Sequence, residues 1–138
     1  MAGEAHPSPY YVLTAEDVVA IYADLLDYSV AEARDLLRSP SGLEGAVGRL
    51  QAHIDYDDAD LATLAAVLAH GIAEGQHFLD GNKRLGAAAM LAFVELNSHT
   101  LDVRPGTVAR WIIDLSFGLT VAELAAQIRS SLVPAASG

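Results

Sequence analysis

Apolar residues recur every three or four positions along most of the chain, which is the spacing of one face of an α-helix. The clearest stripe is formed by Leu61, Leu64, Leu68 and Ile72. Similar stripes predict further helices over residues 14–28, 30–38, 43–54, 85–96, 105–115 and 120–132. No segment alternates regularly between apolar and polar residues, although Leu101 and Val103 are expected to form a short extended piece. The pattern therefore predicts an all-α protein folded as a compact helical bundle.

Short motifs predict where the helices begin and how they are arranged. A hydroxyl residue followed three positions later by an acidic residue is typical of a helix start. Three such pairs occur: Thr14 with Asp17, Ser41 with Glu44, and Thr120 with Glu123. Asp55–Asp58 is expected to be an acidic loop. The run Gly86–Ala89 gives its helix a face of small residues that neighbours can approach closely, so this helix is expected to be central. We expect one domain over residues 11–132, with loose ends at residues 1–10 and 133–138.

Composition and charge restrict the function classes. The chain has 138 residues, of which 52% are hydrophobic, which suits one domain with its own core. Its formal net charge of −10 argues against binding to nucleic acid or to an anionic membrane surface. It has no cysteine, which excludes a disulfide framework and a thiolate nucleophile. With no long apolar run and no leader-like start, a soluble cytoplasmic protein is expected.

One segment, Gln76–Arg84, gathers residues with chemical potential. It contains the only lysine of the chain, Lys83, next to an arginine, although acidic residues outnumber Lys and Arg by 18 to 8. Gly81 would let the backbone approach a ligand closely, and a helix beginning at Asn82 would present free N–H groups and the positive end of its dipole. This combination favours a phosphate site. Asp80 fits such a site if Mg²⁺ lies between its carboxylate and the phosphate.

A purely structural interpretation of the same segment is also open. Asp80 would then cap the following helix, which stabilises a helix by about 1 kcal/mol. Lys83 and Arg84 would be solvated, and Phe78 would belong to the core. Spacing alone does not decide between the two interpretations.

Phe78 followed by Asp80-Gly81-Asn82-Lys83-Arg84 resembles the signature of the Fic/Doc family, His-Pro-Phe-x-Asp-Gly-Asn-x-Arg. The resemblance extends over residues 11–130 and includes the segments 43–51, 91–97 and 118–125. Lys83 stands where AMP-transferring members usually have glycine, and Ala87 stands where they have a second arginine. The chain therefore most resembles the Doc-like (death-on-curing) toxins of this family, and the resemblance implies their all-α fold around a central helix.

The same resemblance implies a function. Doc-like proteins transfer a phosphoryl group from Mg-ATP to a hydroxyl of elongation factor Tu and are neutralised by a cognate antitoxin, while other members transfer a nucleotidyl group. By this resemblance Asp80 would hold Mg²⁺. The phosphates would be held by Gly81, Asn82, Lys83 and Arg84, and the cations Lys83 and Arg84 would also act in the transfer. The acidic residues 55–58 would lie in the flap that docks the target.

The chain departs from the signature at the catalytic histidine. Gln76 takes that place, and His77 takes the place of the proline. A glutamine amide cannot accept a proton near neutral pH, and loss of a general base costs about 10²- to 10⁴-fold in rate. His77 would either replace the missing base after a shift of the loop, or pack against Phe78 or cap a helix.

Three explanations of Gln76 stay open from the sequence. It is an introduced inactivating change, or the mark of a member that binds a nucleotide or partner without efficient transfer, or the mark of a fold repurposed as a small-molecule biosynthetic enzyme. One apolar stripe is expected either in the core or in a groove for an antitoxin helix: Val108, Trp111, Ile112 and Leu115.

Overall fold

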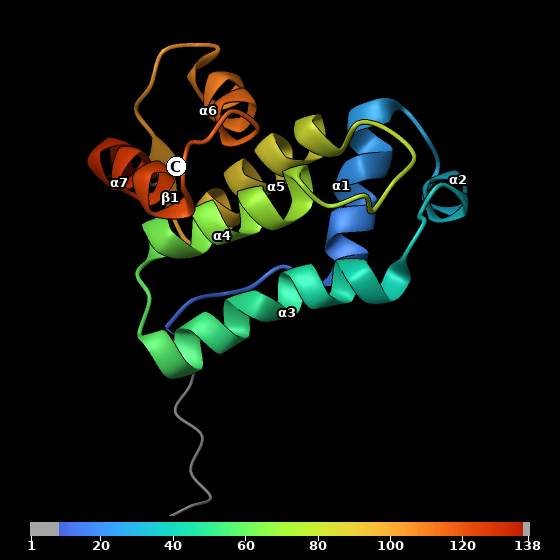
Figure 1. Ribbon diagram of the computed structural model, residues 1–138, viewed down its shortest axis with the longest axis horizontal. Helices are drawn as coiled ribbons and strands as arrows, with labels where there is room; N and C mark the ends of the chain where they lie inside the picture. The colour runs from blue at the N-terminus through green and yellow to red at the C-terminus, as the bar shows by residue number, and fades with distance from the viewer. Residues whose placement is uncertain (1–8, 137–138) are drawn as a thin grey trace, which may run out of the picture.

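The computed structural model describes residues 9–136, and the regular secondary structure of this part is almost entirely helical (Figure 1). Its elements in chain order are α1 (Ala15–Leu26), α2 (Val30–Asp35), α3 (Pro40–Asp57), α4 (Leu61–Ala73), α5 (Asn82–Leu96), β1 (His99–Leu101), α6 (Thr107–Leu115), α7 (Val121–Ser131) and β2 (Leu132–Pro134). The predicted all-α class is confirmed. Among the described helices, none is both long and apolar enough to cross a membrane. The loose arm predicted for residues 1–10 lies almost wholly outside the described residues.

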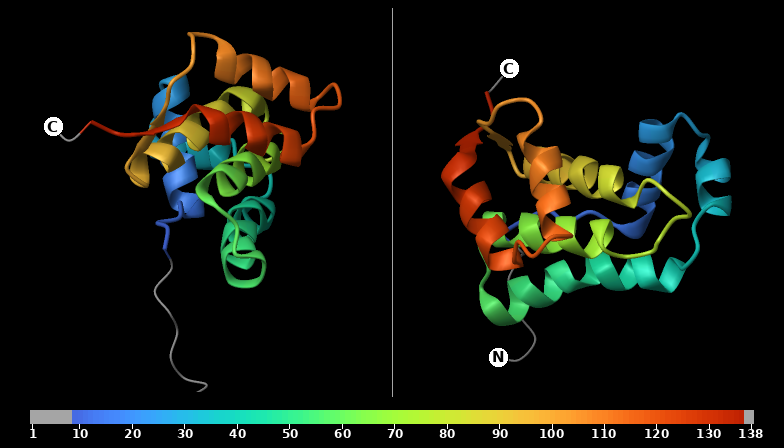
Figure 2. Two further views of the ribbon diagram at one scale, coloured as in Figure 1. Left: turned by 90° about the vertical axis from the view of Figure 1, so that its left-hand side faces the viewer. Right: turned by 45° about the horizontal axis from the view of Figure 1, so that its top comes forward.

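Helices α4 and α5 lie side by side in the middle of the molecule, with α3 and α7 packed against α4 (Figures 1 and 2). The sequence of α4 consists largely of alanine and leucine, and nine of its 13 residues are buried. A helix that is apolar on nearly every side is stable only inside the bundle. Helices α1 and α6 pack against α5, and α1 also contacts α2 and α3.

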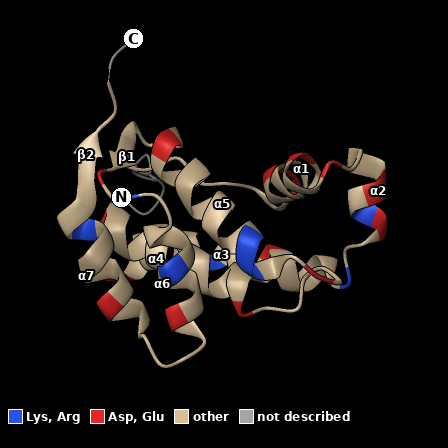
Figure 3. Ribbon diagram, turned by 90° about the horizontal axis from the view of Figure 1, so that it is seen from above, with Lys and Arg blue, Asp and Glu red and all other residues tan. Residues whose placement is uncertain are grey.

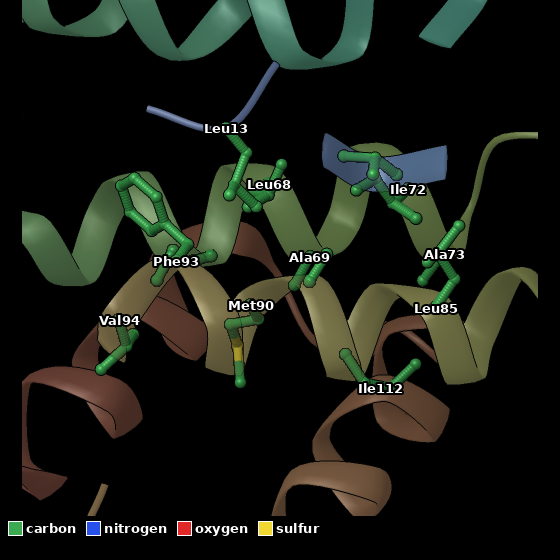
Figure 4. Packing of buried hydrophobic residues seen from close by; sticks show 14 of the residues in the cluster. Leu13, Leu68, Ala69, Ile72, Ala73, Leu85, Met90, Phe93, Val94 and Ile112 are labelled. Carbon is green, nitrogen blue, oxygen red and sulfur yellow. The ribbon is translucent and has the colours of Figure 1, made fainter. Parts of the chain in front are cut away.

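The small face of α5 packs directly against α4. A Cβ atom on Gly86 would lie 2.8 Å from the Cβ of Ala73 and 3.1 Å from the carbonyl oxygen of Ala69, so only glycine fits without movement. Figure 4 shows Ala69 and Ala73 on α4 facing Leu85 and its neighbours on α5. The expectation that α5 is central agrees with its contacts, because it packs against α1, α4 and α6, although only six of its 15 residues are buried. Helix α4 is the more enclosed, since its own residues are apolar all round.

Side chains cap most of the helix starts. Two of the predicted capping boxes are confirmed: Thr14 with Asp17, and Thr120 with Glu123. The predicted cap at Ser41 is wrong, because α3 begins directly after Ser39, whose Oγ accepts a hydrogen bond from the Gly42 N–H at 3.1 Å. Pro40 explains the difference, since proline lacks an N–H and its fixed φ suits the first position of a helix.

The acidic segment 55–58 was expected to be a loop but forms the last turn of α3 and its C-cap. Two side-chain pairs, each between residues one helical turn apart, stabilise this end of the helix. The Gln51 amide donates to an Asp55 carboxylate oxygen at 2.8 Å, and His53 Nδ1 lies 2.7 Å from Asp57 Oδ2. These pairs offset the unfavourable placement of acidic residues at a helix C-terminus. The segment that the resemblance placed in a target-docking flap is therefore the end of a helix and not a loop.

Both ends of the described chain are hydrogen-bonded to residues beside the C-terminal end of α5. The Asn97 side chain accepts a hydrogen bond from the Tyr11 N–H and donates one to the Tyr11 carbonyl, each at 2.9 Å. Strands β1 and β2 pair antiparallel, and the Ala135 N–H donates to the Ser98 carbonyl at 2.9 Å. The loose tail expected from residue 133 is therefore wrong for residues 133–135, which continue the pairing with β1. Residues 137–138 lie outside the described part.

An ion pair between the start of α4 and α7 makes the stability depend on pH. Asp60 caps α4 by accepting from the Thr63 N–H at 2.9 Å, and it also accepts from Arg129 Nε at 2.7 Å. The hydrogen bond from Arg129 holds the pKa of Asp60 well below its usual value. The folded state thus favours the carboxylate. Its stabilisation is present above the ordinary Asp pKa of about 3.9 and is lost as the pH falls below it.

We expect Asp60→Asn to lower the melting temperature at neutral pH and to flatten its decline on acidification below about pH 4. The amide keeps a capping oxygen but loses the charge that favours Arg129. Thermal unfolding followed by circular dichroism across this pH range measures the effect. Asp102→Asn is the matched control, because Asp102 is exposed and its side chain has no partner among the described residues. Equal pH profiles for the two variants would contradict the assignment.

Candidate functional site

The segment that the sequence singled out is the loop between α4 and α5, which runs beside α1 and α2 (Figure 1). The backbone of this loop is hydrogen-bonded to residues 37 and 38, which follow α2. The Arg38 N–H donates to the His77 carbonyl at 2.7 Å, and Leu37 and Phe78 form an antiparallel bridge. The loop is therefore held at its middle, ahead of the point where α5 begins.

Phe78 anchors the loop in the core. Its side chain is fully buried and stacks on the ring of Tyr22, which is also fully buried, with the ring centroids 3.7 Å apart and the planes 10° from parallel. The Phe78 N–H donates to Asn82 Oδ1 at 3.1 Å, and Asn82 Nδ2 donates to the Phe78 carbonyl at 3.0 Å. The side-chain amide of Asn82 thus pairs with the loop backbone. It positions the loop here rather than pointing to a ligand, so the part of Asn82 left for a phosphate is its own N–H.

Helix α5 begins at the place where the sequence predicted a helix start. Gly81 precedes it with a φ of 77°, a left-handed conformation that suits glycine, and it offers no capping side chain. The first backbone hydrogen bond of the helix joins the Leu85 N–H to the Gly81 carbonyl at 2.9 Å. The N–H groups of residues 82–84 therefore have no acceptor within the helix and give its start a positive potential.

The first turn of α5 carries two cationic residues, Lys83 and Arg84, in a molecule where acidic residues outnumber basic ones (Figure 3). Lys83 Nζ lies 2.8 Å from Glu74 Oε2 and 2.6 Å from Ser116 Oγ. The hydrogen bond from Lys83 lowers the pKa of Glu74. Arg84 is exposed and has no hydrogen bond or ion pair with other described residues. Glu74 and Ser116 were missed by the sequence analysis, because neither belongs to a motif and Ser116 is far from Lys83 along the chain.

Asp80 is exposed at the loop end, next to the start of α5. The buried Tyr22 hydroxyl donates to the Asp80 carbonyl at 3.1 Å and lies 3.5 Å from its Oδ1. Burial raises the pKa of Tyr22, and the Asp80 charge raises it further, so the hydroxyl stays a donor. The described residues contain no group of three or more metal-ligating side chains. A single carboxylate fits Mg²⁺ that arrives with a phosphate, because Mg²⁺ takes its remaining ligands from phosphate oxygens and water.

Gln76, at the place of the signature's histidine, and its neighbour His77 have different surroundings. Gln76 is exposed, and its side chain has no partner among the described residues. His77 is only 7% exposed, and its ring Nε2–H donates to the Gly71 carbonyl at 2.8 Å. This bond satisfies one of the last free carbonyls of α4, and any side chain on Gly75 would collide with the ring. His77 thus caps a helix, as one alternative predicted, and in this arrangement it does not supply the missing base.

An apolar cavity of about 480 Å³ opens beside the two cations. Its walls come from α1, α5 and α6, and its lining residues are Leu25, Lys83, Arg84, Ala87, Ala88, Leu91, Ala109, Ile112 and Ile113. Of the stripe that was expected in the core or in a groove, Trp111, Ile112 and Leu115 are buried, and Ile112 also lines this cavity. Periodicity could not predict the cavity, since it depends on how α1 and α6 flank α5.

A family model described as Fic/DOC family matches residues 12–94, which is more than half of the chain. The matched span begins just before α1, includes the whole loop with its cations, and ends near the end of α5. No curated protein matches the chain.

Proposed function

The chain belongs to the Fic/DOC family, and on that premise we propose that it is a Doc-like transferase that moves a phosphoryl or nucleotidyl group from Mg-ATP to a hydroxyl of a protein. Proteins of this family generally transfer a nucleotide-derived group to proteins and bind a nucleoside triphosphate with Mg²⁺. The observation that carries the proposal is the first turn of α5, which has free N–H groups and carries Lys83 and Arg84, and which begins two residues after Asp80.

In this proposal the chain holds the donor through its phosphates. The N–H groups of Asn82, Lys83 and Arg84 bind phosphate oxygens, and the two cationic side chains add charge-assisted hydrogen bonds. Asp80 holds Mg²⁺, which supplies positive charge to the phosphate oxygens when it is bound. Lys83 uses two of its three N–H donors on Glu74 and Ser116 and has one left for a phosphate, whereas Arg84 has no partner among the described residues. The Asn82 amide keeps Gly81 close to the phosphates by fixing the loop.

Gln76 makes slow transfer the expected behaviour of this chain. Its amide can hydrogen-bond a target hydroxyl but cannot take its proton, and His77 is engaged with Gly71. We propose a cytoplasmic target similar to elongation factor Tu and a cognate antitoxin as partners. The apolar cavity beside Lys83 and Arg84 is a suitable place for the apolar side of such a partner.

Lys83→Ala is expected to weaken the binding of Mg-ATP by about tenfold or more, because a charge-assisted hydrogen bond contributes about 1.5–3 kcal/mol. Isothermal titration calorimetry of the purified chain measures the dissociation constant. Arg104→Ala is the matched control: it also removes one exposed cation, but from the segment between β1 and α6 rather than from α5. If both variants lose the same affinity, or if the unsubstituted chain binds no ATP, the assigned phosphate site is wrong.

A second candidate function is favoured by the exposed, unpartnered Gln76: a nucleotide- or partner-binding protein without transfer activity. Incubation of the chain with labelled Mg-ATP and a bacterial lysate separates the two. Label on a lysate protein supports the transferase. ATP binding in the calorimeter without label on any lysate protein supports the binding protein instead.

A further inference from the structure

Three helices meet at a small polar cluster of which only Lys83 belongs to the motif at residues 76–84. Glu74 caps the end of α4, Lys83 lies in the first turn of α5, and Ser116 caps the end of α6. Lys83 Nζ donates to Ser116 Oγ at 2.6 Å, and Ser116 Oγ donates to Glu74 Oε2 at 3.1 Å. Lys83 Nζ also donates to the same Glu74 oxygen at 2.8 Å. Each of the three side chains therefore contacts the other two.

The directions of these hydrogen bonds give Ser116 the environment of a phosphate acceptor. An ammonium group has no lone pair, so Lys83 must be the donor to Ser116, and the hydroxyl proton is left to point at the Glu74 carboxylate. A hydroxyl becomes a better nucleophile when an adjacent base can take its proton. Ser116 is exposed, so a donor bound at the start of α5 can reach it from solvent.

We propose that Ser116 is a self-modification site, at which its hydroxyl accepts the group transferred from Mg-ATP while Glu74 accepts the proton. This inference rests on the proposed function, because it needs phosphates bound at Lys83. A new bond forms between Ser116 Oγ and the phosphorus atom, and the bond from that phosphorus to its leaving group breaks. The leaving group is ADP if the γ-phosphoryl group moves and pyrophosphate if the adenylyl group moves. The Ser116 proton passes to Glu74, and no oxidant or reductant is needed.

Because Lys83 contacts Glu74 and is also a phosphate ligand in this proposal, binding of the donor changes the basicity of the Glu74 carboxylate. In the described structure the bond from Lys83 lowers the pKa of Glu74, which weakens this carboxylate as a base. A phosphate that binds the third N–H donor of Lys83 shares the positive charge of the ammonium group with Glu74. The carboxylate then recovers affinity for a proton while it keeps its bond to the Ser116 hydroxyl. Glu74 thereby takes the part that Gln76 cannot, but only for a hydroxyl that lies against it.

Modification would also limit further turnover. A phosphate ester on Ser116 carries at least one negative charge, so it would hold Lys83 and repel the adjacent Glu74 carboxylate. The ester would thus occupy the cation that the next donor molecule needs. We expect the modified chain to bind Mg-ATP more weakly than the unmodified chain by about tenfold, the same effect as loss of Lys83.

The test is an incubation of the purified full chain with Mg-ATP labelled on either the α- or the γ-phosphate, followed by intact mass measurement and peptide mapping. One label is expected on Ser116, and Ser116→Ala is expected to remove it. Ser130→Ala is the matched control, because Ser130 is an exposed serine on α7. Glu74→Gln keeps an oxygen acceptor but no base, and should slow labelling by about 10²-fold or more. Thermal unfolding of each variant checks that the fold is retained.

The outcomes separate this inference from the proposed function. If Ser116→Ala leaves labelling unchanged, or if the label maps elsewhere, Ser116 is not the acceptor. If lysate proteins are labelled and the chain is not, the self-modification is wrong and the transferase stands. If Ser116 is labelled and no lysate protein is, the self-modification stands without a protein target. Absence of label from both the chain and the lysate overturns both.

Discussion

Replacing Gln76 with histidine is expected to raise the rate of transfer from Mg-ATP to protein hydroxyls by about 10²- to 10⁴-fold. Position 76 is exposed, and its side chain has no partner among the described residues, so an imidazole there would be free to act. A histidine with an ordinary pKa of about 6.5 is largely neutral at pH 7 and can take a proton from the acceptor hydroxyl. The backbone that follows position 76 is held by the hydrogen bond at His77 and the bridge at Phe78, so we expect the loop to keep its conformation in this variant.

The rate is measured as label transferred to lysate proteins per unit time, with Ser116→Ala in the background so that only transfer to other proteins counts. The rate of Gln76→His should rise as the pH passes upward through about 6.5, because only the neutral imidazole accepts a proton. Gln127→His is the matched control, since it places the same substitution on an exposed position of α7. Unchanged transfer by Gln76→His with ATP binding intact would show that no base acts from this position.

Phe78→Ala is expected to lower the free energy of unfolding by about 3–5 kcal/mol, the range for removing a large aromatic side chain from a packed core. Phe78 is fully buried and stacks on Tyr22 at a centroid distance of 3.7 Å, so its loss would leave a cavity against a second buried ring. The effect should reach the site as well. The Asn82 amide pairs with the Phe78 backbone, and a loosened Phe78 would release the start of α5.

Urea unfolding at constant pH gives the free energy, and calorimetry with Mg-ATP under native conditions gives the effect on binding. Phe117→Ala is the matched control, because Phe117 is 85% exposed, and its loss should change the free energy of unfolding by less than about 0.5 kcal/mol. If Phe78→Ala unfolds at the same urea concentration as Phe117→Ala, the loop is not anchored through this ring.

Features that depend on neighbours along the chain could be predicted from the sequence. The helix start at Gly81 and Asn82 and the capping boxes at Thr14 and Thr120 arise from residues within one turn of each other, and the structure confirms them. The wrong prediction of a cap at Ser41 also has a local cause. Two serines flank Pro40, and the preference of proline for the first helical position decides between them.

Features that depend on distant segments could not be predicted. The cluster of Glu74, Lys83 and Ser116 exists because α4, α5 and α6 end or begin at the same place, which no spacing in the sequence reveals. The orientation of His77 likewise depends on the space left by Gly75 and on the Gly71 carbonyl. The family resemblance gave Asn82 a role at the phosphate, but it could not show that the Asn82 side-chain amide pairs with the Phe78 backbone inside the loop.

The fastening of both chain ends beside Asn97 has a practical consequence for anyone who attaches the protein to something else. Tyr11 and Ala135 are bound at the C-terminal end of α5, whereas the loop with Lys83 and Arg84 lies at its N-terminal end. Helix α5 has 15 residues and so separates the two by about 22 Å. Fluorophores, affinity resins or sensor surfaces coupled near Tyr11 or Ala135 would leave the face with the loop open to nucleotides and proteins in solution.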